Sequence, residues 1–275
     1  YYYGAVSNYP QFAIGLGKTV LLDKSFNITG FQKINEHDIF TELHEFQYLD
    51  DDTIIQIGSK SHKYDNQNVD SGIISILNQK NGTNFIWDSI DHVSPDSSIV
   101  PMKEWGMKSN DYFHMNAVRI LSDGNYLASA RHTQTIMKID KLSGEIIWHM
   151  GKGSLNNFKF INDPYNGFSH QHAPEELDNK NILIWDNGIG SIENGSRVCE
   201  YKIDENKLTA TLVWSKEFKD LQANVAGNCY PIDGNNFIAA FGSQGYIQEF
   251  NKDGSNLLSI DPGGLIYQVM KIKVN

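Results

Sequence analysis

The stretch Ile136-Met137-Lys138-Ile139-Asp140, with the polar turn 141–145 and a second strand that ends at Trp148, decides the fold of this chain. Four other stretches repeat the pattern of an apolar strand, a turn of Asn, Asp, Lys, Ser or Gly, and a returning strand: 20–34, 74–87, 200–214 and 248–260. Hairpins that recur about 40–60 residues apart, with several short strands in each repeat, are typical of a β-propeller. The sequence therefore predicts an all-β fold of the propeller type.

Four of the five repeats also have a strand, a turn and a second strand ahead of this hairpin. In one repeat, residues 113–131 alternate and turn back in this way. The first repeat lacks the leading strand, because 12–15 already has the pattern of its second strand, whereas 265–272 predicts a strand without a repeat of its own. We therefore expect the C-terminal strand to pair with the N-terminal blade and to close the ring, which leaves no exposed sheet edge. The count is five repeats, and a sixth, irregular blade could lie in 91–110 or 151–167.

Length and composition indicate a single globular domain over 1–275. Hydrophobic residues make up 40% of the 275 residues, which is enough for a sizeable core. The formal net charge of −10 argues against nucleic acid or an anionic membrane as a partner. No apolar run approaches the roughly 18–20 residues of a membrane-spanning helix, so we expect no membrane span. The oligomeric state is left open.

Two features favour the secretory route, the acceptor triplets for N-glycosylation and the pair of cysteines. The triplets begin at Asn27, Asn81 and Asn194. The chain begins at Tyr1 without Met, which fits either a mature product or a trimmed chain. We therefore expect a secreted or extracellular glycoprotein. Cys199 and Cys229 either bridge neighbouring blades or remain as free buried thiols, and the sequence leaves both alternatives open.

Polar residues gather at one position of the repeats. In a propeller the innermost strands face a common axis, and residues i and i+2 of a strand point to one face. His114 with Asn116 and His170 with His172 have this spacing, and Arg131 ends the strand that follows His114. Histidine at one position of three repeats is hard to explain by packing alone. The side chains expected to meet at one end of the channel are His44, His114, Asn116, Arg131, His170 and His172.

This set of side chains suits an anion better than a metal ion. Imidazole binds zinc, copper, iron and nickel, so a metal site is the first alternative. However, no Asp or Glu occupies these positions, and Arg131 brings a positive charge. Arg, Asn and His together offer hydrogen-bond donors to an oxyanion such as sulfate or phosphate. We expect no metal ion and no cofactor. The recurring Trp87, Trp148 and Trp214 are expected to pack between blades.

Motifs around the same residues occur in one order along nearly the whole chain: 43–46, 87–93, 111–116, 126–132, 138–148, 171–172, 186–188, 196–197 and 242–249. In these motifs the chain resembles the arylsulfotransferase (ASST) family, and within it the fungal-like branch. The resemblance implies a β-propeller, usually six-bladed, that moves a sulfuryl group between phenols without a nucleotide donor. One departure is Gly151-Lys152-Gly153, where the family often has Gly-Gly.

The resemblance also implies roles for single residues. His172, in the Gln-His motif, would carry the sulfuryl group as a covalent sulfohistidine. His170 and Arg197 are expected in substrate binding, and His170 is also the competing nucleophile. The positions that match the rest of the family's active site are His44, His114, Asn116 and Arg131.

These observations predict an aryl sulfotransferase with a ping-pong mechanism, whose partners are an aryl sulfate and a phenol. Imidazole would attack sulfur and displace a phenolate, whose conjugate acid has a pKa of about 10. Arg131 and Asn116 would hold the non-bridging oxygens, and His114 or His44 would move the proton. Two alternatives remain: a catalytically inactive propeller that acts as an extracellular binding or structural module, and a metal-dependent hydrolase or lyase.

Overall fold

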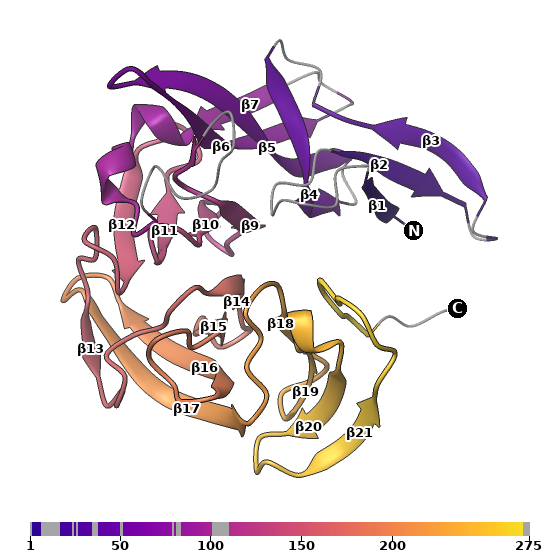
Figure 1. The fold of residues 1–275 in the computed structure, drawn as a ribbon, viewed down its shortest axis with the longest axis vertical. Helices are drawn as coiled ribbons and strands as arrows, with labels where there is room; N and C mark the ends of the chain where they lie inside the picture. The colour runs from indigo at the N-terminus through magenta and orange to yellow at the C-terminus, as the bar shows by residue number, and fades with distance from the viewer. Residues whose placement is uncertain are drawn as a thin grey trace. The chain divides into compact units, whose positions relative to one another are not determined.

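The computed structural model describes residues 2–6, 17–23, 25, 27–34, 38–49, 52–78, 80, 84–100 and 110–271. Strands dominate these residues (Figure 1), and their helices are short 3₁₀ turns: η1 (Ser89–Asp91), η2 (Pro95–Ser97) and η3 (Gly242–Gln244). In the described part of the chain, no helix has the length and apolar character needed to cross a membrane. The predicted all-β class is confirmed.

The described strands form five sheets in which most strands pair with the next strand along the chain. The first sheet contains β1 (Tyr2–Val6), β2 (Gly17–Leu22) and β3 (Ile28–Gln32), and the second contains β4 (Ile39–Tyr48), β5 (Thr53–Tyr64), β6 (Gln67–Asn78), β7 (Asn84–Asp88) and β8 (Asn110–Asp111). The third contains β9 (Met115–Ile120), β10 (Tyr126–Ala130), β11 (Thr135–Ile139) and β12 (Ile146–Gly151). The fourth contains β13 (Lys159–Ile161), β14 (His172–Glu176), β15 (Ile182–Asp186), β16 (Gly195–Asp204) and β17 (Thr209–Lys219), and the fifth contains β18 (Asn228–Pro231), β19 (Asn236–Ala240), β20 (Ile247–Asn251) and β21 (Asn256–Ile260). Such meanders are the arrangement of propeller blades, and the number of blades stays a prediction.

The chain divides into two compact units. Unit 1 comprises residues 1–118 and 142–145, and unit 2 comprises residues 119–141 and 146–275. Unit 1 holds β1 to β8, unit 2 holds β10 to β21, and the boundary falls inside β9. The predicted single domain over 1–275 stays a prediction.

Polar turn residues shape the hairpins, as the sequence pattern predicts. Between β9 and β10 the Asp123 carboxylate accepts the backbone N–H of Asn125 at 2.9 Å, and Gly124 adopts a left-handed φ of 86°. Between β18 and β19 Asp233 accepts the backbone N–H of Asn235 in the same way. An Asp that caps its own turn determines where the preceding strand ends.

Strand β15 contributes to two separate cores of unit 2. Ile182 and Ile184 belong to a cluster that also contains Tyr201, whereas Leu183 and Trp185 belong to a second cluster. This alternation is that of a strand with both faces covered. The sheet that contains β15 therefore packs against one hydrophobic core on each of its two faces.

The two cysteines lie in different cores. Cys199 belongs to the cluster of Ile182, Cys229 belongs to the cluster of Leu183, and both thiols are free. Burial raises the pKa of both thiols. Of the two alternatives for this pair, the free buried thiols are therefore observed.

The recurring tryptophans tie one sheet to a turn of another. Trp87 in β7 is buried, and its indole N–H donates to the Gly144 carbonyl, in the turn between β11 and β12, at 2.9 Å. Trp214 in β17 donates to the Lys252 carbonyl, in the turn between β20 and β21, at 3.0 Å. Trp148 is buried in the first core of unit 2. The predicted packing role between sheets is confirmed.

The C-terminal segment differs from the prediction. Residues 261–271 form no strand. Instead, the Asn228 side chain bonds both backbone groups of Val269 at 2.8 Å, and the Gly227 N–H donates to the Tyr267 carbonyl. In this segment the Asn228 side-chain amide, and not the backbone of a neighbouring strand, bonds the N–H and C=O of Val269. Residues 12–15 and 272 lie outside the described residues, and ring closure by the C-terminal strand is not confirmed.

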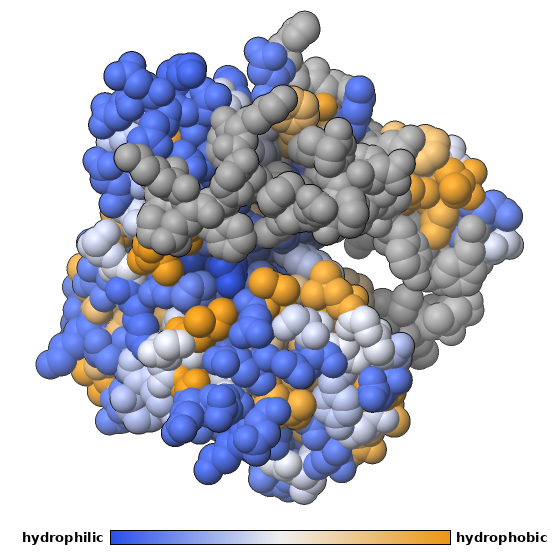
Figure 2. Space-filling model, in the orientation of Figure 1, coloured by the Kyte–Doolittle hydropathy of each residue, from blue (hydrophilic) through white to orange (hydrophobic). Residues whose placement is uncertain are grey.

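Large hydrophobic side chains are exposed on two strands that end their sheets. Ile28 and Phe31 on β3 are 62% and 54% exposed, and hydrophobic residues gather over this strand in Figure 2. On β21, Leu257, Leu258 and Ile260 are 50%, 46% and 43% exposed. Among the described residues, β3 and β21 each stand at one end of the strand order of their sheet.

Candidate functional site

Two histidines of unit 1 each contact a carboxylate. Strand β4 pairs with β5 as far as Thr41 and resumes at Phe46, so residues 42–45 form a bulge. In this bulge His44 Nδ1 lies 2.8 Å from Glu42 Oε2. Glu42 is buried, and burial raises the pKa of its carboxyl group. The bulge therefore holds His44 against an acidic partner.

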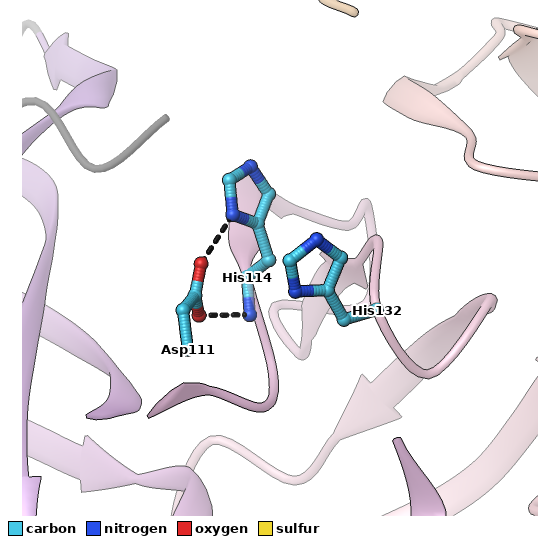
Figure 3. Close-up of side chains that lie close together, drawn as sticks. All are labelled: Asp111, His114 and His132. Atoms are coloured by element: carbon cyan, nitrogen blue, oxygen red, sulfur yellow. Dashed lines mark hydrogen bonds and ion pairs between the residues drawn. The ribbon is translucent and has the colours of Figure 1, made fainter. Parts of the chain in front are cut away.

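His114 has the same kind of partner. Asp111, in β8, accepts the backbone N–H of His114 at 2.8 Å and also contacts its Nδ1 (Figure 3). His114 has a left-handed φ of 51°, which costs on the order of 1–3 kcal/mol for a residue other than glycine. Its ring lies edge-on to that of His44, with the centroids 5.1 Å apart. We call these four residues the histidine–carboxylate cluster: Glu42, His44, Asp111 and His114.

This cluster corrects two expectations from the sequence. The first was that the histidines have no acidic neighbours, but Glu42 and Asp111 lie just before them in the chain and fold back onto them. The second was that His114 and Asn116 share a strand face. Strand β9 begins only at Met115, and the left-handed His114 precedes it. Asn116 lies fully buried within β9.

His172 is the first residue of β14 and is 3% exposed. Its Nδ1 lies 2.8 Å from Asn187 Oδ1 and 3.2 Å from the backbone oxygen of His170. The preceding Gln171 is fully buried, and its amide nitrogen donates to the backbone carbonyls of Ala130 and Thr135. Gln171 thus anchors the start of β14 to the neighbouring sheet, which fixes the position of His172.

His170 is held as a neutral imidazole at neutral pH. Burial and the positive charge of Arg131 lower its pKa to about 4. Its Nδ1 accepts a hydrogen bond from Gln134 Nε2 at 3.2 Å. His170 has a left-handed φ of 54° and precedes β14, so the expectation that it shares a strand face with His172 is wrong.

Arg131 and His132 begin the turn between β10 and β11. Arg131 Nη2 donates to the Asn224 carbonyl at 3.0 Å, which holds one side of the guanidinium. His132, which is drawn in Figure 3, is buried. This turn therefore places a cation within electrostatic reach of His170.

Arg197 has no exposed surface. Its Nε donates to Asp186 Oδ2 and its Nη1 donates to Asp163 Oδ1, both at 2.8 Å. The other oxygen of Asp186 accepts the backbone N–H groups of Ser169 and Gly188 at 2.8 and 2.9 Å. Arg197 therefore supports the loops before β14 and after β15, and its predicted contact with substrate stays a prediction.

The structure brings the predicted residues together in two groups. Unit 1 contains His44, His114 and Asn116, and unit 2 contains Arg131, His170 and His172. The convergence of both groups on one pocket stays a prediction.

Four partners of the histidines were missed by the sequence reasoning. They are Glu42, Asp111, Asn187 and Tyr267, whose ring centroid lies 6.4 Å from that of His172. Asp111 and Asn187 stand inside the motifs 111–116 and 186–188, so the sequence contained a signal for both. Tyr267 lies in the segment that was predicted as a strand.

Consecutive antiparallel meanders, with histidines at irregular points of their leading strands, define the class of this protein: an all-β protein built of repeated sheets. The family model named Arylsulfotransferase (ASST) matches residues 21–269. The chain belongs to the arylsulfotransferase family. A search among curated proteins found no match.

Solved structures show only distant similarity. A protein of unknown function from Bacteroides caccae shares 13% identity over 71% of this chain and 56% of its own, with a TM-score of 0.41. BamB from Moraxella catarrhalis shares 11% identity over 98% of this chain and 79% of its own, with a TM-score of 0.40. Virginiamycin B lyase from Staphylococcus aureus shares 11% identity over 94% of this chain and 83% of its own, with a TM-score of 0.44. The family assignment does not rest on these similarities.

Proposed function

We propose that the protein is an aryl sulfotransferase that moves a sulfuryl group from an aryl sulfate to a phenol through a covalent sulfohistidine at His172. The observation that carries the proposal is the buried His172, oriented by Asn187 and faced by Tyr267, in a chain of the arylsulfotransferase family. Donor and product are both aryl sulfates of similar energy, so the exchange needs no nucleotide donor.

The reaction runs in two half-reactions. First, an imidazole nitrogen of His172 attacks sulfur, the bond from sulfur to the aryl oxygen breaks, and phenolate leaves with the bonding electrons. Second, a phenol loses its proton and attacks the sulfur of the sulfohistidine, which returns free His172. The Tyr267 ring offers an aromatic surface to the aryl group of either substrate.

Three donors are proposed to hold the non-bridging sulfuryl oxygens. Arg131 supplies a positive charge, and Asn116 supplies an amide. His170 supplies its Nε2–H, because its Nδ1 already accepts from Gln134 and the ring is neutral at neutral pH. Positioned donors of this kind typically contribute about 2.7–4 kcal/mol each to the stability of a transition state.

The histidine–carboxylate cluster is proposed to move the proton. A carboxylate beside Nδ1 stabilises the imidazolium form, which suits a group that alternately gives and takes a proton. Asp111 contacts both the backbone and the ring of His114, whereas Glu42 contacts only the ring of His44. We therefore assign the acid–base role to His114 and the supporting role to His44.

Incubation with 4-nitrophenyl sulfate tests the proposal. Wild-type protein should release one phenolate per chain in a burst and gain the mass of one sulfuryl group, and a second phenol should remove it. His172→Gln should abolish burst and adduct, whereas the matched variant His170→Gln should keep the adduct and transfer more slowly. A wild-type protein that never releases phenolate or becomes sulfated would leave the binding-module alternative in its place.

The histidine–carboxylate cluster also favours one alternative, because a carboxylate on Nδ1 is the usual outer partner of a metal-bound histidine. A metal-dependent hydrolase or lyase would contain a bound metal by elemental analysis and would lose activity in EDTA. The proposed sulfotransferase should keep its full activity in EDTA, because none of its steps uses a metal ion.

We also propose that the protein is secreted and glycosylated. Asn27 and Asn194 are exposed between strands, as an acceptor of glycan must be, and Asn81 lies outside the described residues. Protein expressed through a eukaryotic secretory pathway should lose mass on treatment with an N-glycosidase, and Asn194→Gln should remove part of that loss.

A further inference from the structure

The side chain of Asn187 has a single allowed orientation. Its amide nitrogen donates to the backbone carbonyls of Ala223 and Ala226 at 2.7 and 3.0 Å, and the whole residue is buried. Both amide hydrogens are therefore used. A flipped amide would set its oxygen against two carbonyl oxygens, which is repulsive and leaves two buried acceptors without a donor. Asn187 must present its oxygen to His172.

This orientation determines where His172 carries its proton. Asn187 Oδ1 lies 2.8 Å from His172 Nδ1, and the second neighbour of that nitrogen, 3.2 Å away, is the His170 carbonyl. Both neighbours accept hydrogen bonds and neither can donate one, so Nδ1 must bear the hydrogen. We infer that Asn187 is a positioning residue that holds His172 in its Nδ1–H tautomer, which makes Nε2 the atom that carries the sulfuryl group. This inference rests on the proposed function.

The bonds and charges of the step balance. The Nε2 lone pair forms the bond to sulfur, the bond from sulfur to the aryl oxygen breaks, and its electron pair leaves with the phenolate. The ring keeps its hydrogen on Nδ1 and becomes a sulfated imidazolium, whose positive charge faces the Asn187 oxygen. An amide oxygen is neutral, so it orients this ring without neutralising it. The ring thus stays a good leaving group for the second half-reaction.

The partner of His172 therefore differs in kind from the partners in the histidine–carboxylate cluster. Asp111 and Glu42 offer carboxyl oxygens to His114 and His44, whereas Asn187 offers an amide oxygen. A carboxylate partner favours the imidazolium form of a ring that exchanges protons, whereas a neutral amide leaves the positive charge of the sulfated ring in place. The distinction lies in the partners, because the reacting group is imidazole in all three residues.

The tautomer can be measured without any activity. In uniformly ¹⁵N-labelled wild-type protein above the titration range of histidine, the His172 ring, assigned by its loss in His172→Gln, should show a protonated Nδ1 and an unprotonated Nε2. A protonated Nε2 would overturn the inference. In sulfated protein the same spectra should place the new bond at Nε2. A sulfuryl group on Nδ1 would overturn the inference and leave the proposed function intact, whereas a failure to become sulfated would count against the proposed function alone.

Asn187→Asp gives a second readout. A carboxylate at this position stabilises the imidazolium, so the acidic limb of the pH–rate profile should move to higher pH, and transfer at neutral pH should fall on the order of 10–100-fold, as for other residues that orient an imidazole. Asn206→Asp, in the exposed turn between β16 and β17, adds the same charge and should leave rate and profile unchanged. A folded Asn187→Asp protein with the wild-type profile would contradict the positioning role, and the wild-type tautomer decides the question if this variant does not fold.

Discussion

Each of the four candidate histidines is distinguished by the partner of its Nδ1. Carboxylates face His44 and His114, an amide oxygen faces His172, and the amide N–H of Gln134 faces His170. The Nδ1 partner favours one tautomer of the ring, whereas the neutral state of His170 comes from burial and from the charge of Arg131. One side-chain type can therefore serve as proton carrier, nucleophile and neutral donor in the proposed mechanism.

The lowered pKa of His170 predicts a loss of stability in acid. Its pKa is about 4 in the folded protein, against 6.5 for an ordinary histidine. Below pH 6.5 the unfolded chain gains a proton that the folded protein does not bind, so the free energy of unfolding should decrease as the pH falls from about 6.5 to 4. Urea unfolding across this range should show a smaller decrease in His170→Gln. Equal decreases in both proteins would contradict the environment described for His170.

Tyr267 is predicted to contribute to substrate binding through its ring. Its edge-on contact with His172 places the ring where an aryl group would approach. Tyr267→Ala should raise the KM for 4-nitrophenyl sulfate about tenfold or more, the factor expected from an aromatic contact of about 1.5 kcal/mol. Tyr267→Phe keeps the ring and should keep the KM within about twofold. An equal loss in both variants would point to the hydroxyl group instead.

At the scale of elements, hairpins were predictable and strand starts were not. Turn residues such as Asp123 and Asp233 cap their own turns, so their positions in the sequence predict where the hairpins turn. The bulge at 42–45 and the left-handed His114 and His170 break the alternation of the leading strands. An argument from i and i+2 assumes an unbroken strand, and it fails where the candidate histidines lie.

The tryptophan links between sheets should differ in strength. Trp87→Phe removes the donor to the buried Gly144 carbonyl and should lower the free energy of unfolding by about 1–3 kcal/mol. Trp214→Phe removes the donor to Lys252, where both residues are partly exposed and water can replace the lost bond, and should cost about 0.5–1.5 kcal/mol. Urea unfolding of the two variants checks the order. A larger loss at Trp214 would contradict it.

The Asn228 amide is predicted to hold the C-terminal segment in place. Asn228→Ala removes both hydrogen bonds to Val269, so residues beyond Gly264 should become sensitive to limited proteolysis while the rest of the chain stays resistant. Because that segment carries Tyr267, the variant should also share the raised KM of Tyr267→Ala. A protease pattern identical to that of the wild type would show that other contacts suffice.

At the scale of the whole molecule, the all-β class and the family were accessible from repeats and motifs spread along the chain. The course of the C-terminal segment was not. Its apolar alternation from Leu265 resembles a strand, but the contacts that hold it come from the Asn228 side chain and the Gly227 backbone. Periodicity describes one segment at a time and carries no information on a partner distant in the sequence.

The reactivity of the two cysteines tests whether both thiols are buried and free in the folded protein. Cys199 and Cys229 are free, buried and raised in pKa, so the folded protein should react with a thiol reagent only on the timescale of unfolding. Two thiols should react at once in urea, and dithiothreitol should leave the melting temperature unchanged. A melting temperature that falls on reduction would indicate a disulfide in solution.

Each tryptophan hydrogen bond can form only after a turn later in the chain has been synthesised. Trp87 leaves the ribosome 57 residues before the carbonyl to which it binds, and Trp214 leaves 38 residues before its own. At about 5–20 residues per second, the strand that carries each tryptophan waits on the order of seconds before the turn that binds its indole is translated. During that interval a large apolar ring is uncovered on the nascent chain. Slow codons within 88–144 should therefore lower the yield of native protein more than slow codons after residue 252, by which point both indoles have met their partners.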